Sequence, residues 1–405
     1  MLAPELRRGR PGARGWLVVA ALFTVTFSIS NPFAAFGVFL PIFADVFGWS
    51  RGSISIAISL NLLLGGVLGF AVGAIADRHG PRSTLVVTAS LGGAGFALAG
   101  TVTALWQLHL YIGVMAGAGM CGFYVIAATT VARWFAHQRG LALGVVLTGF
   151  NLGFMTGGPL AAVAIEHLGW RVAYGLLGGG FGLIGVLAAL FVTFPPSASP
   201  SPRQRVVRAS QDVGGLTLTE AFGEGRFWSI GTAWLVNGAV LMTVSVHVVP
   251  YARDAGISLE RAALGLTAYG VGAAIARVGV GALADRLEAH AVMHVCAAMQ
   301  IAALLAIVVR PSEALLLVGL GAFGFGFAGS DTLFVRVVPE VFGVKALGAI
   351  MGVLSLGWRC GAALGPTAAG YLRDATGSYA LPFGAAPFAV GLTYLLFVTT
   401  ARRPR

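Results

Sequence analysis

Three ionisable residues, Arg277, Asp331 and Arg359, lie well inside apolar segments of helical length. A charge in the hydrocarbon core of a bilayer is unfavourable, by about 3 kcal/mol on insertion scales, so such a residue usually faces a protein interior or a water-filled cavity. A guanidinium presents a planar fork of donors that fits a carboxylate, and a low-dielectric cavity screens this attraction little. Arg277 and Arg359 are therefore predicted to bind an organic anion. The alternative is that either arginine pairs structurally with Asp331 or with backbone carbonyls.

Asp331 is the candidate proton carrier. An apolar bundle disfavours an ionised carboxyl and nearby arginines favour it, so Asp331 is suited to bind and release a proton. With Asp331 ionised, the two arginines and the carboxylate sum to +1, and with Asp331 protonated they sum to +2. An anion and a proton would then bind together. The alternative is that Asp331 pairs with Arg336 near the cytoplasmic end of the same helix.

Further polar residues within apolar segments are candidates for the walls of the same cavity. Tyr124, Asn151, Asn31 and Trp358 offer hydroxyl, amide and ring contacts, and we predict that they contact the substrate. His247 falls toward the outer end of its segment and is predicted to belong to an outer gate or a proton route. The alternative for each of these residues is a packing role in the helix core, with its polar group satisfied there.

The elements that position these residues are membrane spans. Of the 405 residues, 57% are hydrophobic and only 10% charged, which excludes a soluble domain of this size and indicates an all-α membrane protein. At 1.5 Å per residue, Arg277 lies about 12 Å from Asp285, and Arg359 about 21 Å from Lys345, in the middle third of the bilayer. Twelve spans are predicted, at residues 16–43, 53–76, 83–104, 107–132, 140–165, 170–194, 227–250, 260–284, 290–309, 314–338, 345–371 and 379–400.

The basic residues predict the orientation of these spans. If both termini are cytoplasmic, the cytoplasmic segments hold 18 of the 26 Lys and Arg residues, the outer segments hold 6, and 2 lie within spans. This bias indicates cytoplasmic termini, and it explains the net charge of +11 without a nucleic-acid partner. The arginine-rich composition suggests a bacterial inner membrane. The three cysteines fall in predicted spans without metal-ligand spacing, so neither a metal nor a cofactor is expected.

An internal repeat divides the chain into two related halves. Five glycines recur after 208 positions: 140, 144, 149, 153 and 157 become 348, 352, 357, 361 and 365. The repeat also relates Arg359 to Asn151 and Arg277 to Gly69, so the second half carries cations where the first has neutral groups. We predict six-helix bundles at 1–195 and 226–405, joined by a cytoplasmic linker at 196–225 that includes a short amphipathic segment.

A loop signature occurs once in each half. Gly73, Asp77 and Arg78 lie in the segment GAIADRHGPR, and the segment GALADR brings Asp285 and Arg286 to the same offset of 208. The first copy resembles the signature loop between the second and third helices of the major facilitator superfamily, and the second copy is a weaker form of it. The resemblance implies a twelve-helix transporter in which these loops act in gating.

Other segments resemble the monocarboxylate transporter and oxalate:formate antiporter group within that superfamily. They are FGVF followed by FGWS near residue 36, WFAHQRGLALG near 134, and HVVPYARDAG near 247. In those families an arginine in the eighth helix anchors the carboxylate, and Arg277 matches it. The antiporter branch has a second cation, a lysine, about where Arg359 stands. The monocarboxylate branch has an aspartate four residues before its arginine, where this chain has Ala273, so the usual coupling scheme does not carry over.

The function predicted from these features is secondary transport by alternating access, not catalysis. The expected substrate is a small monocarboxylate such as L-lactate or pyruvate, carried with a proton, by a protein that works as a monomer in the bilayer. Exchange of small dicarboxylates, as in oxalate:formate antiport, is the alternative, and proton-free facilitated diffusion also stays open. A multi-span sensor or scaffold is the rival from another class.

Overall fold

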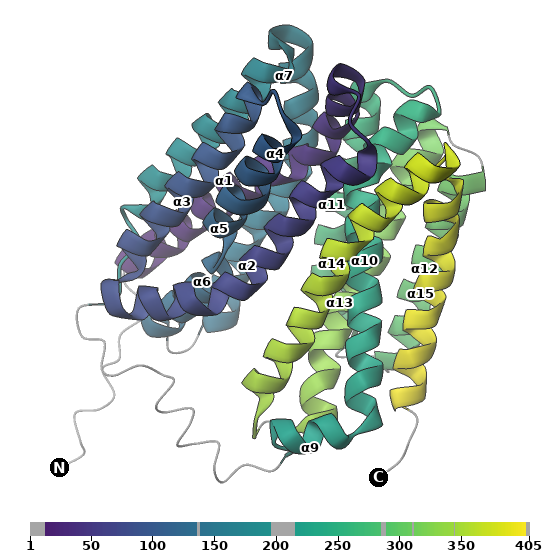
Figure 1. Cartoon of the computed structure of the whole chain (residues 1–405). Helices are drawn as coiled ribbons and strands as arrows, with labels where there is room; N and C mark the ends of the chain where they lie inside the picture. Colours follow the sequence, from purple (N-terminus) through teal and green to yellow (C-terminus); the bar gives the residue numbers. More distant parts are fainter. Residues whose placement is uncertain are drawn as a thin grey trace, which may run out of the picture.

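The computed structural model describes residues 13–135, 138–195, 215–284, 289–309, 312–343 and 345–401. Almost all of these residues are helical, and the sole extended pairing among them is an isolated bridge between Gly215 and Gly343. The prediction of an all-α membrane bundle is confirmed. Two groups of helices, one from each half of the chain, lie side by side (Figure 1).

The helices of the first half follow in chain order. They are α1 (Ala13–Phe47), α2 (Arg51–His79), α3 (Pro81–Leu98), the short η2 (Ala99–Thr101), α4 (Leu105–Leu108), η3 (His109–Ala116), α5 (Gly117–Met120), α6 (Phe123–Trp134) and α7 (Arg139–Ala189). Those of the second half are α9 (Leu218–Gly223), α10 (Gly225–Asp254), α11 (Leu259–Ala284), α12 (Ala289–Val309), α13 (Glu313–Phe342), α14 (Leu347–Thr376) and α15 (Ala380–Ala401).

These helices account for the twelve predicted spans. Ten helical segments of the described chain are long and apolar enough to cross a bilayer, and one of them, α7, is two helices that meet at Gly169. Gly169 has φ 75° and ψ 157°, a conformation that glycine adopts without the steric penalty of a side chain. Counting α7 twice gives eleven spans, and α11, with 26 residues, occupies the place of the twelfth between α10 and α12.

The fourth predicted span, 107–132, is broken in its middle. Its helix stops at Met120, Cys121 is extended, and Gly122 has φ 75° in the left-handed region before α6 begins. An added Cβ at Gly122 would lie 2.5 Å from the Val72 side chain, so only glycine fits this bend. The prediction of one continuous span is therefore wrong at this point. The break interrupts the helical hydrogen bonding near the middle of the span, the depth at which transporters with discontinuous helices bind their ligands.

The repeated glycines hold equivalent helices together in the two halves. An added Cβ at Gly149, Gly153 or Gly157 of α7 would meet the carbonyl oxygens of residues 23, 27 and 31 in α1. At positions 357, 361 and 365 of α14, it would meet the carbonyls of residues 231, 235 and 239 in α10. The contacted carbonyls also differ by 208, so the sequence repeat corresponds to the same close packing in both halves. Gly348 and Gly352, by contrast, face open space.

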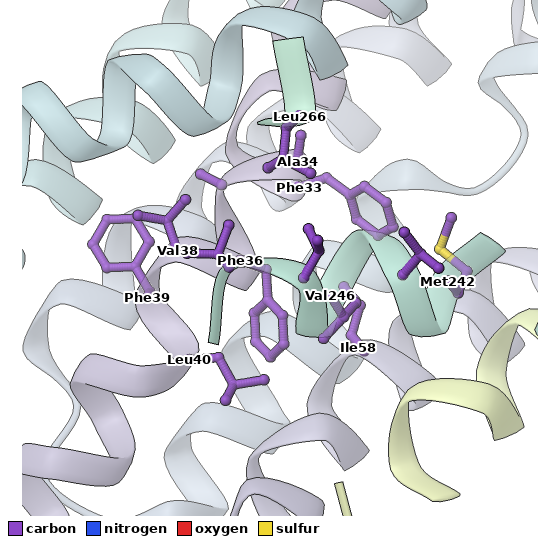
Figure 2. Close-up of a cluster of buried hydrophobic side chains, with 14 of the residues drawn as sticks. Phe33, Ala34, Phe36, Val38, Phe39, Leu40, Ile58, Met242, Val246 and Leu266 are labelled. Carbon is purple, nitrogen blue, oxygen red and sulfur yellow. The ribbon is translucent and has the colours of Figure 1, made fainter. Parts of the chain in front are cut away.

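At one end of the bundle, which we term the closed end, the halves share one hydrophobic cluster. It joins Phe36 of α1 and Ile58 of α2 to Val246 of α10 and Leu266 of α11 (Figure 2). An added Cβ at Gly37 would lie 2.9 Å from the carbonyl oxygen of Val246, so α1 and α10 are in backbone contact there. This end carries the helix termini at residues 47, 51, 254 and 376.

At the opposite end, which we term the open end, each half has a cluster of its own. Leu22 and Ile126 belong to a cluster of first-half residues, whereas Ile230 and Phe334 belong to a cluster of second-half residues. The ribbons of the two halves lie close at the top of Figure 1 and diverge toward the bottom, where α9 lies. The two halves therefore separate toward the open end.

Helix α2 shows where the separation begins. An added Cβ at Gly52 would meet the ring of Tyr371, and one at Gly66 would lie 2.8 Å from Cδ of Arg359, both in α14 of the other half. From Gly69 onward, the glycines of α2 face residues of their own half. The depth of Arg359 thus marks the boundary between the closed and open parts of the interface.

Candidate functional site

Arg277 and Asp331 lie close together in the second half. Arg277 projects from α11 with an exposed side chain, and Asp331 projects half-buried from α13. Each acts electrostatically on the phenol of Tyr269, and Arg277 acts on Asp331, yet no ion pair within 4.0 Å joins these two described side chains. The predicted alternative of a locked Arg277–Asp331 pair is therefore not what the structure shows. Instead, the guanidinium keeps donors available beside a carboxyl group.

Trp234 of α10 positions Asp331. Its indole Nε1 donates to Asp331 Oδ1 at 3.4 Å, and its ring stacks on Phe334 with centroids 6.2 Å apart. Trp234 is 5% exposed, so the donor is fixed within the core of the second half. Trp234 and Asp331 are 97 positions apart, so their contact was not predictable from the sequence. The alternative partner, Arg336, has a side chain outside the described part of the chain.

Arg359 lies at the interface between the halves, apart from that cluster. Its side chain rests against Gly65 and Gly66 of α2, and an added Cβ at Gly65 would be 3.7 Å from its Nη1. It also acts electrostatically on Cys121, at the break in the fourth span. Within the described residues it has neither a hydrogen bond nor an ion pair. Arg359 is therefore a second available cation, held where α14 meets the first half.

Four other predicted substrate contacts are distributed unevenly. Tyr124, two residues after the break, is 48% exposed, and Asn151 of α7 is half-buried. Asn31 is fully buried in the uninterrupted helix α1, where its amide donates to Thr156 Oγ1 of α7 at 3.0 Å. Trp358 packs against Gly238 of α10. Tyr124 is thus exposed, Asn151 and Trp358 are both half-buried, and Asn31 alone of the four is enclosed in the packing of two helices.

A row of aromatic rings, which the sequence analysis did not identify, crosses from the first half to the second. Phe123 stacks on Phe150 with centroids 5.5 Å apart and planes at 4°, and Phe150 is followed by Phe154 at 6.4 Å. Phe154 contacts Tyr269 of α11 at 6.1 Å and 59°. Because Tyr269 also lies near Arg277, the row begins at the break in the fourth span and ends beside the candidate anion site.

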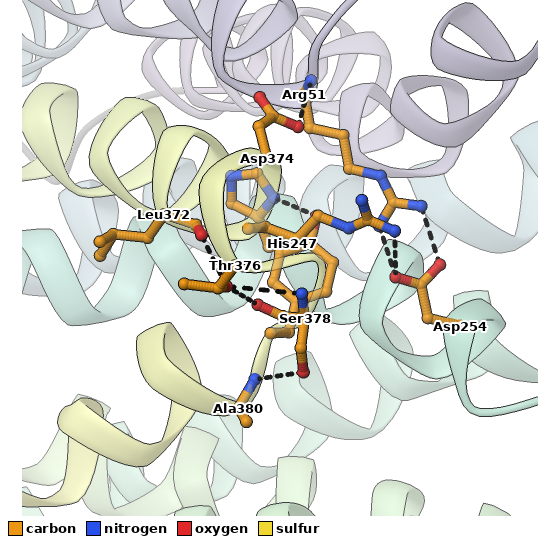
Figure 3. Close-up of polar contacts among 10 residues, drawn as sticks. Arg51, His247, Asp254, Leu372, Asp374, Thr376, Ser378 and Ala380 are labelled. Carbon is orange, nitrogen blue, oxygen red and sulfur yellow. Dashed lines mark hydrogen bonds and ion pairs between the residues drawn. The ribbon is translucent and has the colours of Figure 1, made fainter.

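The closed end is fastened by ion pairs between the halves (Figure 3). The two guanidinium nitrogens of Arg51, the first residue of α2, each donate to one carboxylate oxygen of Asp254 at 2.8 Å. Asp374 of α14 accepts from the backbone N–H of Arg51 at 3.1 Å and of Gly52 at 2.7 Å. Within the second half, Arg373 of α14 also contacts Asp254, at 3.3 Å. From the sequence, Arg51 and Arg373 were predicted only as basic residues of the outer segments, and no partner was predicted for Asp254 or Asp374.

His247 lies within this closed end, fully buried between the halves. Its Nε2 is 2.7 Å from the Pro366 carbonyl and 3.3 Å from the Ser55 hydroxyl of α2, and its Nδ1 is 2.8 Å from the Tyr379 hydroxyl. Since a carbonyl only accepts, Nε2 carries a hydrogen, and in the neutral ring Tyr379 donates to Nδ1. His247 therefore connects α10 to α14 and α2 at the place predicted for a gate.

The signature loop lies at the open end. Asp77 accepts from Arg133 of α6 at 2.6 Å, which ties α2 to α6 within the first half. Gly73 faces Val125, and Arg78 is exposed. The second copy of the loop, with Asp285 and Arg286, lies outside the described residues.

Known proteins resemble this chain along most of its length. Mouse (Mus musculus) monocarboxylate transporter 11 is 29% identical over 385 residues, covering 92% of this chain and 84% of the relative. A gallate transporter of Pseudomonas putida is 27% identical over 401 residues, covering 84% and 86% of the two chains. These relatives are transporters, not enzymes.

Solved structures share the fold at low identity. An inward-facing, unoccupied bacterial homologue of the human lysosomal transporter Spinster superposes with a TM-score of 0.75 at 16% identity over 98% of this chain and all of that one. The nucleoside transporter NupG gives 0.78 at 12% identity over 95% of this chain and all of that one. The profile of the Major Facilitator Superfamily matches residues 22–308 and 240–405. The two matches together cover most of the protein, and the chain belongs to the Major Facilitator Superfamily.

Proposed function

We propose that the protein carries small organic anions, and that its substrate is a monocarboxylate such as L-lactate or pyruvate that crosses together with a proton. The observation that carries this proposal is the guanidinium of Arg277, exposed within a membrane helix beside Asp331 but not paired with it. Such a guanidinium is suited to bind the carboxylate of a ligand. The relatives named as monocarboxylate transporters support the same substrate class.

Asp331 supplies the proton site in this proposal. Its carboxyl is close enough to Arg277 for the charge of one group to affect the other, and Trp234 holds its Oδ1. Protonation of Asp331 removes a negative charge beside the guanidinium and so favours binding of an anion there. Arg359 rests against α2 of the other half, so in this proposal its contacts change when the two halves move relative to one another.

The chain is proposed to lie in a bacterial inner membrane with both termini in the cytoplasm. The closed end, fastened by Arg51, Asp254 and Asp374, would then face outward, and the open end would face the cytoplasm. Rocking of the two halves about the depth of Arg359 would open one end as it closes the other. The protein is proposed to do this as a monomer.

A second candidate substrate class is an aromatic monocarboxylate, which the row of rings favours. A ligand whose carboxylate binds Arg277 would have the phenol of Tyr269 and the ring of Phe154 within the same region. Aromatic rings attract one another in offset or edge-to-face geometry by about 1 kcal/mol beyond the burial of area. The similarity to a gallate transporter agrees with this class.

The test is transport by the purified protein in proteoliposomes. Uptake of radiolabelled L-lactate, gallate and oxalate is measured with and without an inward proton gradient. Arg277→Ala should lower uptake by about tenfold to a hundredfold, as expected when hydrogen bonds to a charged group are lost. The matched control is Arg261→Ala in the same helix, because Arg261 pairs with Glu313 on the exposed surface.

Each outcome of this assay separates the candidates. Lactate accumulation that needs the gradient and Arg277 supports proton symport of a small monocarboxylate, and preference for gallate supports the aromatic class. Oxalate exchange that ignores the gradient supports the dicarboxylate alternative, and lactate equilibration without a gradient effect supports facilitated diffusion. If Arg277→Ala and Arg261→Ala transport alike, the role of Arg277 is wrong. If none of the anions moves, the proposed function is wrong and the sensor or scaffold gains support.

A further inference from the structure

The first turn of α2 holds two carboxylates of the other half at once. Both carboxylate oxygens of Asp254 in α10 accept from the guanidinium of Arg51 at 2.8 Å. The carboxylate of Asp374 in α14 accepts from the backbone N–H groups of Arg51 and Gly52. The Arg51 side chain is 10% exposed, so water reaches it little while the end is closed. All four hydrogen bonds go to acceptors of the second half.

These contacts have the chemistry by which proteins bind a free carboxylate. A guanidinium pairs with both oxygens of a carboxylate in parallel, and N–H groups at the start of a helix attract a negative group. The two modes are separate here, since Asp254 uses the side chain of Arg51 and Asp374 uses the backbone. The structure therefore contains a group of donors that fits carboxylates, and carboxylates of the same chain occupy it in this state.

Opening of the closed end must empty this site. A ligand from that side reaches Arg277 or Arg359 only if α2 moves away from α14 and α1 from α10. Asp254 and Asp374 both belong to the second half, which moves away from α2 when this end opens. Arg51 and the two N–H groups therefore lose their acceptors together. The first half then presents an unpaired guanidinium and two unpaired backbone donors to the incoming solution.

We propose that Arg51 and the N–H groups of Arg51 and Gly52 form a second binding site for the substrate carboxylate in the state open at this end. We term it the Arg51 site. The substrate carboxylate takes the place of one of the two carboxylates that leave, which offsets part of the free energy lost when the contacts part, and the substrate then passes to Arg277. This proposal rests on the proposed function, because it takes the transported ligand to be a carboxylate.

The test compares the two partners of one ion pair. The KM is measured for transport starting from the side of the closed end, with L-lactate, or with gallate if that is the carboxylate that the wild type carries. If the Arg51–Asp254 ion pair did no more than hold the closed end together, Arg51→Gln and Asp254→Asn would both favour the state in which this end is open. Both would then lower this KM, since apparent affinity rises with the fraction of binding-competent protein.

The Arg51 site predicts changes of opposite sign. Asp254→Asn removes a competing carboxylate and should lower the KM, whereas Arg51→Gln removes the binding group and should raise it, each by about fivefold to tenfold, as for a contact of roughly 1 kcal/mol. Arg51→Lys keeps the positive charge but lacks the two parallel donors of a guanidinium, so its KM should lie between those of the wild type and Arg51→Gln. Glu313→Gln, which breaks an ion pair within one half at the same end, should leave the KM unchanged.

Shifts of the same sign for Arg51→Gln and Asp254→Asn, or no shift for Arg51→Gln, overturn the Arg51 site while leaving the proposed function intact. If Arg51→Gln does not yield folded protein, as judged by size-exclusion chromatography, Arg51→Lys carries the test, and an unchanged or lowered KM overturns the site equally. Failure of the wild type to carry any carboxylate overturns the proposed function and this site with it.

Discussion

The two ends of the bundle differ in what holds the helices there. At the closed end, the halves share a hydrophobic cluster, backbone contacts and the Arg51–Asp254 ion pair. At the open end, each half has its own cluster, and the ion pair described there, between Arg133 and Asp77, joins helices of one half. Contacts between halves must break during transport, whereas contacts within a half persist. The comparison therefore separates the parts of the molecule that move from those that stay together.

The largest contrast is expected in the reactivity of single cysteines at the two depths. In a variant without the three native cysteines, Tyr124→Cys should react readily with a water-soluble maleimide, because residue 124 is 48% exposed. Ser55→Cys should react about tenfold to a thousandfold more slowly, because it becomes accessible only in a minor state that is open at the closed end. The labelling rates of the purified protein in detergent measure this difference.

A control strengthens that experiment. Asp254→Asn in the Ser55→Cys background should raise the labelling rate, since it weakens the closed end. Equal rates for Ser55→Cys and Tyr124→Cys in otherwise unaltered protein would contradict the assignment of closed and open ends.

A smaller but sharper contrast is expected from two glycines of the same helix. An added Cβ at Gly370 of α14 would lie 2.7 Å from the backbone of Gly52 in the other half, whereas one at Gly348 would meet nothing within 4 Å. Gly370→Ala should therefore destabilise the closed arrangement by about 1–3 kcal/mol through overpacking. Gly348→Ala should be neutral or stabilising by up to about 1 kcal/mol, because alanine favours the helix.

Thermal unfolding and Ser55→Cys labelling of the two glycine variants test this prediction together. Gly370→Ala should melt at a lower temperature and label faster, and Gly348→Ala should do neither. If both variants behaved alike, the close contact between α2 and α14 would be wrong.

The smallest effect is expected at α9, on the open end. Thr217 and Glu220 form a capping box, and the backbone N–H of Thr217 donates to the Glu220 carboxylate at 2.7 Å, which lowers the pKa of Glu220. A lowered pKa means that the stabilisation is present above the ordinary pKa of about 4.5 and is lost as the pH falls through the lowered value. Amide exchange in residues 217–223 should therefore speed up slightly, after correction for intrinsic rates, between pH 6 and pH 3.

Glu220→Gln is the matched variant for that measurement. It retains an acceptor for Thr217 but has no proton to gain, so the corrected exchange rates should lose their pH dependence. A pH dependence equal to that of the wild type would assign the effect to another group.

The sequence predicted the parts of this structure that recur at short or fixed spacing. Apolar runs indicated the spans, and the offset of 208 anticipated that Gly153 and Gly361 occupy equivalent places. These features depend on local periodicity or on the repeat, which a single sequence contains.

The features that the sequence analysis missed depend on contacts between distant residues. Arg51 and Asp374 are 323 positions apart, and nothing in the sequence around either residue indicates the other. Gly122 did not stand out as a break because the chain has 59 glycines, most of them compatible with helix packing. Phe150 and Phe154 are spaced like any buried helix face, so only their contact with Tyr269 distinguishes them.

The glycine contacts between α7 and α1, and between α14 and α10, have a mechanical consequence. Backbones that touch at successive helical turns cannot slide or tilt past one another without collision, so each helix pair moves as one rigid unit. The interface between the halves is softer where α14 meets α2 at the depth of Arg359, because one long side chain rests there against Gly65 and Gly66. A force that pulls on either end of the bundle would therefore bend the molecule at that depth, where a few degrees of rotation become roughly 1–2 Å at the ends, about 25 Å away at 1.5 Å per residue.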